Sequence, residues 1–320
     1  MLQPRLDSMF EIVVVPPGAD ELSEQMGTKF KFWYQDEVYG RTLFKEGRPG
    51  TGENWAEKLA CEFAALLGIP HAHYELAQWQ GRNDVIRHGV ICPSVVPDGA
   101  RLIHGNELVG GKVTVANADE KVNNYALRNH LATRVFQFLH QASDILMPPQ
   151  GYQPIEGVHS PLGVFIGYLL FDALIANQDR HSENWALIRT STDFYLSATY
   201  DHGSSLGRNE TDETRSTILT TRDRGQSMDA YVRRARSAFY PAAAPGIKVK
   251  AYLTLDLFQL ACKMDPIAGR AWQTQLSKIT EKHFVEVISR VPVGLMSDVA
   301  KEFTEKLLFA NIDRLLSLEI

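Results

Sequence analysis

The sequence predicts a two-lobed α+β protein, with a small antiparallel sheet and one helix in the first lobe and a larger, mostly helical second lobe. In the first hundred residues, short β-branched or aromatic runs alternate with polar turns. From about Gly99 onward, apolar residues recur mostly at helical spacing. The chain has 320 residues, enough for two ordinary domains, so we expect lobes at residues 1–98 and 99–320.

The first lobe begins with strand-like runs. Glu11–Val15 is β-branched, and Phe30–Tyr34 and Arg41–Glu46 flank a polar segment, Asp36–Gly40, that ends in glycine. Two such runs around a glycine-containing turn are typical of a β-hairpin. Further strand-like runs occupy Ala72–Gln78 and Val85–Val96.

One helix is expected within this lobe, at Asn54–Leu67. Its apolar residues fall at positions 55, 59, 63, 66 and 67, which lie along one side of a helix. Asn54 with Glu57 fits an N-cap pattern, and Gly68 followed by Pro70 is a stop signal.

The second lobe carries the helical pattern. Asn124–Ala142 is amphipathic, and Gly163–Ala176 is apolar almost all round, which predicts a buried central helix. Two short strands, Trp185–Arg189 and Phe194–Tyr200, interrupt the helices, and the helical pattern resumes after Ser227.

A polar segment, Gly207–Gln226, separates the last strand from the final helices. It is rich in threonine and charge and has no apolar stripe, so we expect a mobile surface segment without a helix. Its arginines could receive acidic or phosphorylated groups of a protein substrate: Arg208, Arg215, Arg222 and Arg224.

The composition excludes several classes of protein. With 33 basic and 38 acidic residues the net charge is −5, which argues against a nucleic-acid or anionic-membrane binder driven by bulk charge. The longest nearly uncharged apolar run, Pro161–Phe171, is too short to span a bilayer. Three distant cysteines, Cys61, Cys92 and Cys262, form neither a disulfide framework nor a metal motif, and no secretory signal is visible, so we expect a cytoplasmic protein.

A polar loop follows the predicted buried helix, with the sequence Asn177-Gln-Asp-Arg-His-Ser-Glu-Asn184. A strand leads out of this loop, and a second strand returns and ends at Asp201-His-Gly203. Because a hairpin brings its two ends together, Asp179, Asn184 and Asp201 should converge in space.

Phosphoryl transfer needs such a cluster. One carboxylate accepts the proton of the attacking hydroxyl, and a second carboxylate with an amide oxygen holds Mg²⁺ on the nucleotide phosphates. In protein kinases the metal-binding Asn lies five residues after the catalytic Asp, and Asn184 lies five residues after Asp179.

A kinase also needs a cation on the phosphates. Lys45 ends the strand before the predicted helix, which is the place of the phosphate-binding lysine. Its ion-pair partner on that helix is Glu57 or Glu62. Helical spacing favours Glu62, which flanks the apolar stripe, because Glu57 also fits the capping pattern.

These motifs resemble those of the HipA-like kinases, whose bilobed, protein-kinase-like fold is distantly similar to the phosphatidylinositol kinases. The resemblance covers nearly the whole chain and is most specific at Asn-x-Asp-Arg-His-x-x-Asn with its downstream aspartate. Looser matches are Leu43–Lys45, Trp55–Ala60 with Leu67–Pro70, Leu102–Leu108 and Asp201–Gly207.

The resemblance implies an ATP- and Mg²⁺-dependent serine/threonine protein kinase. It makes Asp179 the catalytic base and Asn184 and Asp201 the metal ligands, and it gives Glu57, not Glu62, the place of the helix glutamate. The remaining nucleotide contacts that it implies are Lys45, the phosphate loop with Gly27, Thr28, Lys29 and Lys31, the adenine hinge with Cys92, Pro93, Ser94 and Val95, and His181.

The resemblance also implies acceptors and partners. Its members act on protein serine or threonine, often autophosphorylate, and include toxins controlled by a small regulatory or antitoxin partner. Candidate autophosphorylation sites here are Ser23 in the first lobe and, in the polar segment, Thr211, Ser216, Thr217, Thr220 and Thr221.

Other functions remain open. A lipid or small-molecule kinase would use the same motif, and a catalytically inactive kinase-like binding module would retain the fold alone. A metal-dependent hydrolase would bind Zn²⁺ or Mn²⁺ through Asp179, His181, Asp201 and His202. Gly203–Gly207 matches the G-x-S-x-G elbow of hydrolases, which requires a helix directly after the serine.

Overall fold

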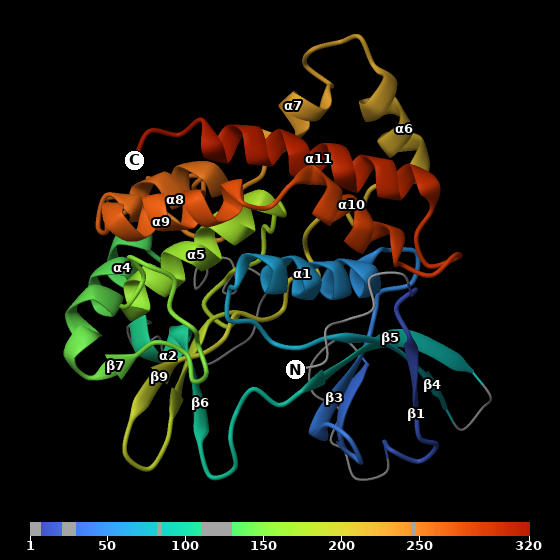
Figure 1. Cartoon of the computed structure of the whole chain (residues 1–320), viewed down its shortest axis with the longest axis horizontal. Coiled ribbons are helices and arrows are strands. Elements are labelled where there is room, and N and C mark those ends of the chain that lie inside the picture. The colour runs from blue at the N-terminus through green and yellow to red at the C-terminus, as the bar shows by residue number, and fades with distance from the viewer. Residues whose placement is uncertain (1–7, 21–29, 82–84, 110–129, 245–246) are drawn as a thin grey trace.

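The computed structural model describes residues 8–20, 30–81, 85–109, 130–244 and 247–320. The amino-terminal part forms a five-stranded sheet with one helix, and the rest forms a second, smaller sheet and a layer of helices (Figure 1). The elements of the first part are β1 (Ile12–Val15), β2 (Lys31–Asp36), β3 (Gly40–Glu46), α1 (Glu53–Leu67), β4 (Glu75–Gln80) and β5 (Ile86–Pro93).

The strands of this sheet lie in the order β1-β4-β5-β3-β2. The predicted hairpin is β2 and β3, in which Lys31 lies opposite Lys45 and Asp36 opposite Gly40. All pairs are antiparallel, as expected, except that β1 runs parallel to β4 at the edge of the sheet. The difference arises because β1 does not pair with the next strand along the chain, so no hairpin determines its direction.

Side chains along β3 alternate between two environments. Phe44 belongs to a buried cluster with Phe32 and Trp79 on one face of the sheet. Lys45, the next residue, therefore lies on the other face, and there its side chain meets α1.

Helix α1 lies between the first sheet and α10 (Glu281–Ser289) (Figure 1). It ends as predicted at Gly68, whose φ of 68° is the left-handed cap that glycine adopts without strain. Its start differs from the prediction, because Gly52 is the N-cap and Asn54 lies inside the first turn. The Asn54–Glu57 capping prediction is therefore wrong, and Glu57 turns inward to Lys45 instead.

The second part contains more strands than predicted. β8 and β9 form the expected hairpin, and β6 and β7 extend it to a sheet of order β6-β8-β9-β7. The elements are β6 (Arg101–His104), α2 (Gly105–Val109), α4 (Ala132–Gln141), η1 (Ala142–Asp144), β7 (Leu146–Met147), α5 (Pro161–Leu174), β8 (Ala186–Arg189), β9 (Phe194–Leu196), α6 (Asp212–Thr220), α7 (Met228–Val232), α8 (Thr254–Cys262), α9 (Pro266–Ser277), α10 and α11 (Asp298–Leu316).

Helix α5 is the predicted buried helix, and every one of its residues is buried. Ser160 caps its start by accepting a hydrogen bond from the Gly163 N–H, and Pro161 occupies the first turn. Helices α8, α9 and α11 pack on it. The end of α5 is thereby fixed in the core, directly before the polar loop at residues 177–184.

Two predictions about helices differ from the structure: one helix is shorter than expected, and one was not expected. Of the amphipathic segment Asn124–Ala142, residues 132–141 form α4, and residues 124–129 lie outside the described residues. The polar segment does contain a helix, α6, contrary to the prediction. α6 begins because Thr211 accepts a hydrogen bond from the Thr214 N–H and because acidic residues fill its first turn, and no apolar stripe is needed.

Within the described residues no helix has the length and apolar character to cross a membrane. All three cysteines are free thiols. One continuous apolar cluster runs from α1 through α5 to α11, so the inner side of the first lobe and the helical layer share a core.

Candidate active site

Lys45 stands at the centre of a cluster of carboxylates. Its Nζ donates to Glu57 Oε1 at 2.9 Å and to Asp201 Oδ1 at 2.6 Å. Glu53 Oε1 lies 3.7 Å from the same nitrogen. The Lys45 side chain is only 11% exposed, so the first sheet, α1 and the segment after β9 meet around one ammonium group.

Glu57, and not Glu62, is the partner of Lys45 on α1. Glu57 is fully buried, and its second oxygen, Oε2, accepts the His202 N–H at 2.8 Å. Glu62 instead pairs with Lys58 at 2.6 Å and lies 3.6 Å from Arg290. Helical spacing alone favoured Glu62, and this preference is wrong because the face of α1 that meets β3 is the one carrying Glu57.

The charges of this cluster depend on one another. Burial works to lower the pKa of Lys45, but Glu57 and Asp201 outweigh burial and raise that pKa above its ordinary value. Burial raises the pKa of Glu57, while Lys45 opposes the rise. The Lys45 amine is therefore protonated, and a phosphate-binding group requires this positive charge.

The loop at residues 177–184 is organised around its own backbone. The Asn184 Nδ2 donates to the Asp179 carbonyl at 2.6 Å, and the Asp179 N–H donates to Asn177 Oδ1 at 3.2 Å. Asn184 is buried, whereas the Asp179 side chain is 51% exposed. Asp179 is thus held in place by its main chain and presents its carboxylate to solvent.

A buried ion pair that sequence reasoning missed holds this loop. Asp172, near the end of α5, binds Arg180 through both of its oxygens. Arg180 also donates to the Asn184 carbonyl at 3.2 Å and to His202 Nε2 at 3.2 Å. Arg180 therefore connects the loop to the segment that follows Asp201. A charged residue inside an otherwise apolar helix, as Asp172 is, was the signal that could have found it.

β9 ends at Leu196, so the predicted strand Phe194–Tyr200 is shorter than expected and Asp201 lies five residues beyond it, in a strained position. Its φ is 58°, in the left-handed region, and its N–H donates to the Tyr74 hydroxyl at 3.1 Å. Its side chain is 41% exposed. Gly203 follows closely packed against α1: a Cβ at this position would lie 2.9 Å from Glu53 Cγ and 3.0 Å from Glu57 Oε1.

The donor set suits Mg²⁺. Asp201 offers a partly exposed carboxylate, and Asn184 uses its amide nitrogen on the Asp179 carbonyl, which leaves the amide oxygen as its possible ligand. A hard divalent cation prefers such oxygens and completes its shell with water and phosphate.

Some of the nucleotide contacts that the resemblance implies lie within the described residues, and others do not. Cys92–Val95 lies at the end of β5, where Cys92 pairs with Leu43 and the Ser94 N–H donates to the Arg41 carbonyl at 2.8 Å. Lys31 lies opposite Lys45 on β2. Gly27, Thr28 and Lys29, with the candidate acceptor Ser23, lie outside the described residues.

The solved structures of other proteins show the same arrangement of the chain. A crystal structure of CtkA, a proinflammatory kinase of Helicobacter pylori, superposes with a TM-score of 0.63 over 96% of this chain and 98% of that chain, at 17% identity. HipA of Shewanella oneidensis, solved with HipB and its operator DNA, gives a TM-score of 0.53 over 93% of this chain and 67% of that chain, at 12% identity. The chain has the HipA-like kinase fold.

At these identities the likeness establishes the HipA-like fold alone. No protein-family model and no curated protein sequence matches the chain.

Within this HipA-like fold the histidines do not assemble a metal site. His202 is buried and its Nε2 meets Arg180 Nη2 and the Thr199 hydroxyl. Burial and Arg180 lower the pKa of His202 well below its usual value, so the ring is neutral. Among the described residues no group of three or more His, Cys, Asp or Glu side chains is arranged to hold a metal ion. The hydrolase reading thereby loses His202 as a ligand.

The serine-hydrolase elbow also lacks its context. Ser205 is buried, and the next helix, α6, begins only at Asp212. The elbow requires a helix directly after the nucleophile and an exposed serine.

The arginines expected to receive a substrate divide in two. Arg208 and Arg215 are buried and paired with Glu53 and Asp212, so their availability as docking groups was predicted wrongly. These side chains stabilise the turn after the hairpin and the start of α6. Arg222 and Arg224 are exposed, as expected.

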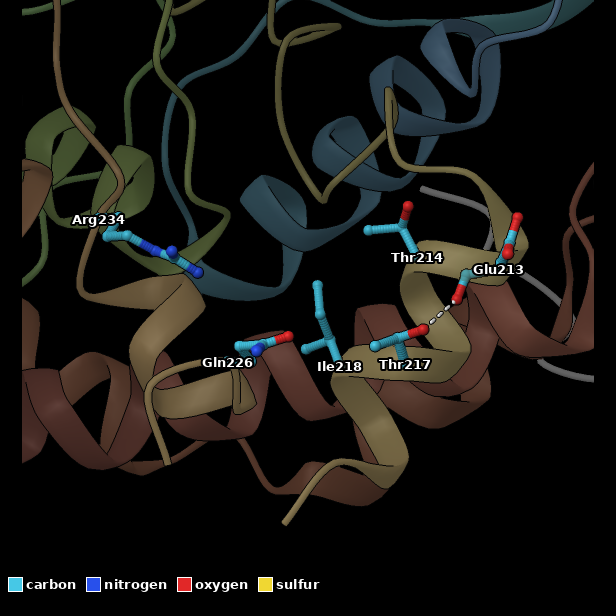
Figure 2. A pocket seen from close by; sticks show the side chains of 6 residues that line it. All are labelled: Glu213, Thr214, Thr217, Ile218, Gln226 and Arg234. Carbon is cyan, nitrogen blue, oxygen red and sulfur yellow. Dashed lines mark hydrogen bonds between the residues drawn. The ribbon is translucent and has the colours of Figure 1, made fainter. Parts of the chain in front are cut away.

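The candidate acceptors of the polar segment lie on or beside α6. A hollow of about 360 Å³ adjoins this helix, and Figure 2 shows Thr217 at its edge, with its hydroxyl donating to the Glu213 carbonyl at 2.9 Å. Apart from Thr217, no candidate site residue lines the hollow, whose lining residues are Glu213, Thr214, Thr217, Ile218, Gln226 and Arg234.

Proposed function

We propose that the protein is an ATP- and Mg²⁺-dependent protein serine/threonine kinase. The observation that carries the proposal is the position of Lys45 Nζ, between Glu57 at 2.9 Å and Asp201 at 2.6 Å. A lysine paired with a helix glutamate beside a metal-binding aspartate is the phosphate site that kinases need.

Each residue of the cluster has a defined task in this proposal. Lys45 binds nucleotide phosphate with a charged ammonium, and Glu57 holds Lys45 in position from a buried site. Mg²⁺ held by Asp201 and Asn184 would offset the charge that develops on the transferred phosphoryl group. Asp179 accepts the proton of the attacking hydroxyl, for which its exposed carboxylate is accessible.

The site for the adenine ring and the kind of phosphate acceptor follow from the resemblance. Adenine would contact Cys92–Val95, at the end of β5, and the phosphates would lie near Lys31 and Lys45. CtkA is a kinase and HipA is solved with HipB. We extend to this chain a protein hydroxyl as acceptor and a small regulatory partner of the antitoxin type.

Labelled ATP tests the proposal. Wild-type protein with Mg²⁺ should transfer the γ-phosphate to serine or threonine of itself or of an added protein. Asp179→Asn should lower the rate of transfer by about 100-fold or more while nucleotide binding persists. Asp98→Asn, an exposed aspartate outside the cluster, is the matched control and should behave as wild type. Absence of transfer by wild type, or equal rates in wild type and Asp179→Asn, would refute the proposal.

A further inference from the structure

A serine of the chain itself contacts the proposed base. The Ser204 hydroxyl donates to Asp179 Oδ2 at 3.3 Å. A general base acts on a hydroxyl within about 2.6–3.2 Å, and such contacts are often longer before substrate binds. Asp179 therefore already holds a serine hydroxyl close to the distance at which it would hold an acceptor.

Arg208 defines the direction of this hydroxyl. Its Nη2 donates to Ser204 Oγ at 3.0 Å, so the serine oxygen accepts from Arg208 and its proton points toward Asp179. A guanidinium beside the oxygen also stabilises negative charge that develops there when the proton leaves.

The backbone places Ser204 next to the Lys45 cluster. Ser204 lies three residues after Asp201, and Gly203 lets the chain pass against Glu53 and Glu57 without a Cβ. Beyond it the Leu206 N–H donates to the Ile175 carbonyl at 2.8 Å, which ties the turn to the end of α5. The hydroxyl is thereby held beside the proposed base, three residues along the chain from the proposed metal ligand Asp201.

Other hydroxyls of this region make different contacts. Thr217 and Thr220 donate to carbonyls of α6, at 2.9 and 2.8 Å, and Thr211 caps that helix. Ser205 is buried, and its Oγ has no hydrogen-bond partner among the described residues. Ser204 is the serine of this segment that meets Asp179.

We propose that Ser204 is an internal phosphate acceptor, phosphorylated within its own chain; the proposal rests on the kinase function proposed above. The Ser204 oxygen forms a bond to the γ-phosphorus of ATP, and the bond from that phosphorus to the β–γ bridging oxygen breaks. ADP leaves with the bridging oxygen. The Ser204 proton passes to Asp179 and then to solvent.

The surroundings indicate what this phosphate does. Arg208 Nε and Nη1 are buried without a hydrogen-bond partner among the described residues, although Nη1 lies 3.4 Å from Glu53 Oε2. A phosphate on Ser204 would bind these donors and bring about two negative charges beside Glu53 and Asp179. Repulsion from this charge opposes the phosphates of a nucleotide, so phosphorylation of Ser204 closes the site to further substrate.

Peptide mass spectrometry after incubation with ATP and Mg²⁺ tests the acceptor. Phosphate should appear on Ser204 at a fractional rate independent of protein concentration, as an intramolecular reaction requires. Ser204→Ala should lose this phosphopeptide at an unchanged melting temperature, and Ser205→Ala, the neighbouring control, should retain phosphate on Ser204. Transfer to other hydroxyls with Ser204 unmodified overturns this inference and leaves the proposed kinase function standing. Absence of transfer to any hydroxyl overturns both.

Calorimetry of ADP binding in the presence of Mg²⁺ provides a readout that does not depend on turnover. The Ser204-phosphorylated protein should bind ADP at least about tenfold more weakly than the same protein after phosphatase treatment, a difference of about 1.4 kcal/mol. Equal affinities would overturn the inhibitory role of the phosphate.

Discussion

Lys45 and Asp201 are separated by 156 positions in the chain and joined by a 2.6 Å hydrogen bond. The same lysine contacts Glu57 on α1, and Glu57 in turn receives the His202 N–H. Three elements, β3, α1 and the segment after β9, thus share one ion-pair network. This network leads to predictions for Glu57 and Asp201, and two buried groups outside it, Arg180 and His130, lead to two more.

The pairing of Lys45 with Glu57 predicts unequal roles for the two glutamates of α1. Glu57→Gln removes the negative charge that orients Lys45 and should lower kcat/KM for phosphotransfer roughly tenfold or more, or about 1.4 kcal/mol of transition-state stabilisation. Glu62→Gln is the matched control, since Glu62 pairs with Lys58 and not with Lys45. Equal losses in the two variants would show that the Lys45–Glu57 contact has no catalytic part.

Asp201 is predicted to couple nucleotide binding to Mg²⁺. Wild-type protein should bind ATP more tightly with Mg²⁺ than without it, and Asp201→Asn should lose most of that difference, because an amide replaces the charged ligand. Titration calorimetry with and without Mg²⁺ measures both affinities. Asp193→Asn, in the turn between β8 and β9, should retain the Mg²⁺ effect. A full Mg²⁺ effect in Asp201→Asn would remove Asp201 from the metal site.

The buried Asp172–Arg180 pair should dominate the stability of the loop. Arg180→Met leaves the Asp172 carboxylate buried without its cation, which typically destabilises a protein by about 3–5 kcal/mol. Urea unfolding measures the loss. The control is Arg189→Met at an exposed position, expected to change the free energy of unfolding by about 0.5 kcal/mol or less. A loss for Arg180→Met as small as for the control would mean that the pair does not hold the loop.

Stability should fall on acidification because of His130. Burial lowers the pKa of His130 to about 4, and its Nε2 accepts the Trp185 Nε1–H at 2.9 Å. Its ordinary pKa is about 6.5, so the unfolded chain binds a proton first as the pH drops below that value. The stabilising contribution is therefore complete above about pH 6.5 and is lost toward pH 4, by about 2 kcal/mol between pH 7.5 and pH 5.

Urea unfolding at pH 7.5 and pH 5 tests this prediction. His130→Gln retains an acceptor for Trp185 but cannot titrate, so its stability should depend less on pH by about that amount. Parallel pH profiles in wild type and variant would show that His130 does not titrate on unfolding.

Sequence patterns within a short segment predicted the elements whose structure depends on that segment alone. The β2–β3 hairpin follows from alternation around a glycine-containing turn, and α5 from an apolar run. β6 and β7 were not predicted, because strands of 4 and 2 residues exist only by pairing with β8 and β9. α6 was not predicted because a capped, acidic start, and not an apolar stripe, marks it.

The same distinction applies to the site. The spacing of Asp179 and Asn184 is local, and it led to these residues directly. The choice between Glu57 and Glu62 depends on which face of α1 meets β3, a tertiary relationship that helical periodicity does not contain. Hydrophobic patterning also counts against a buried carboxylate, and Glu57 is buried because Lys45 and the His202 N–H bind it.

A crystal structure with a non-hydrolysable ATP analogue and Mn²⁺ would show whether nucleotide and metal meet at the Lys45 cluster. An anomalous Mn²⁺ peak should lie in contact with Asn184 and Asp201, with the analogue's phosphates bound to Lys45. A nucleotide bound elsewhere, or a metal that contacts neither Asn184 nor Asp201, would contradict this assignment.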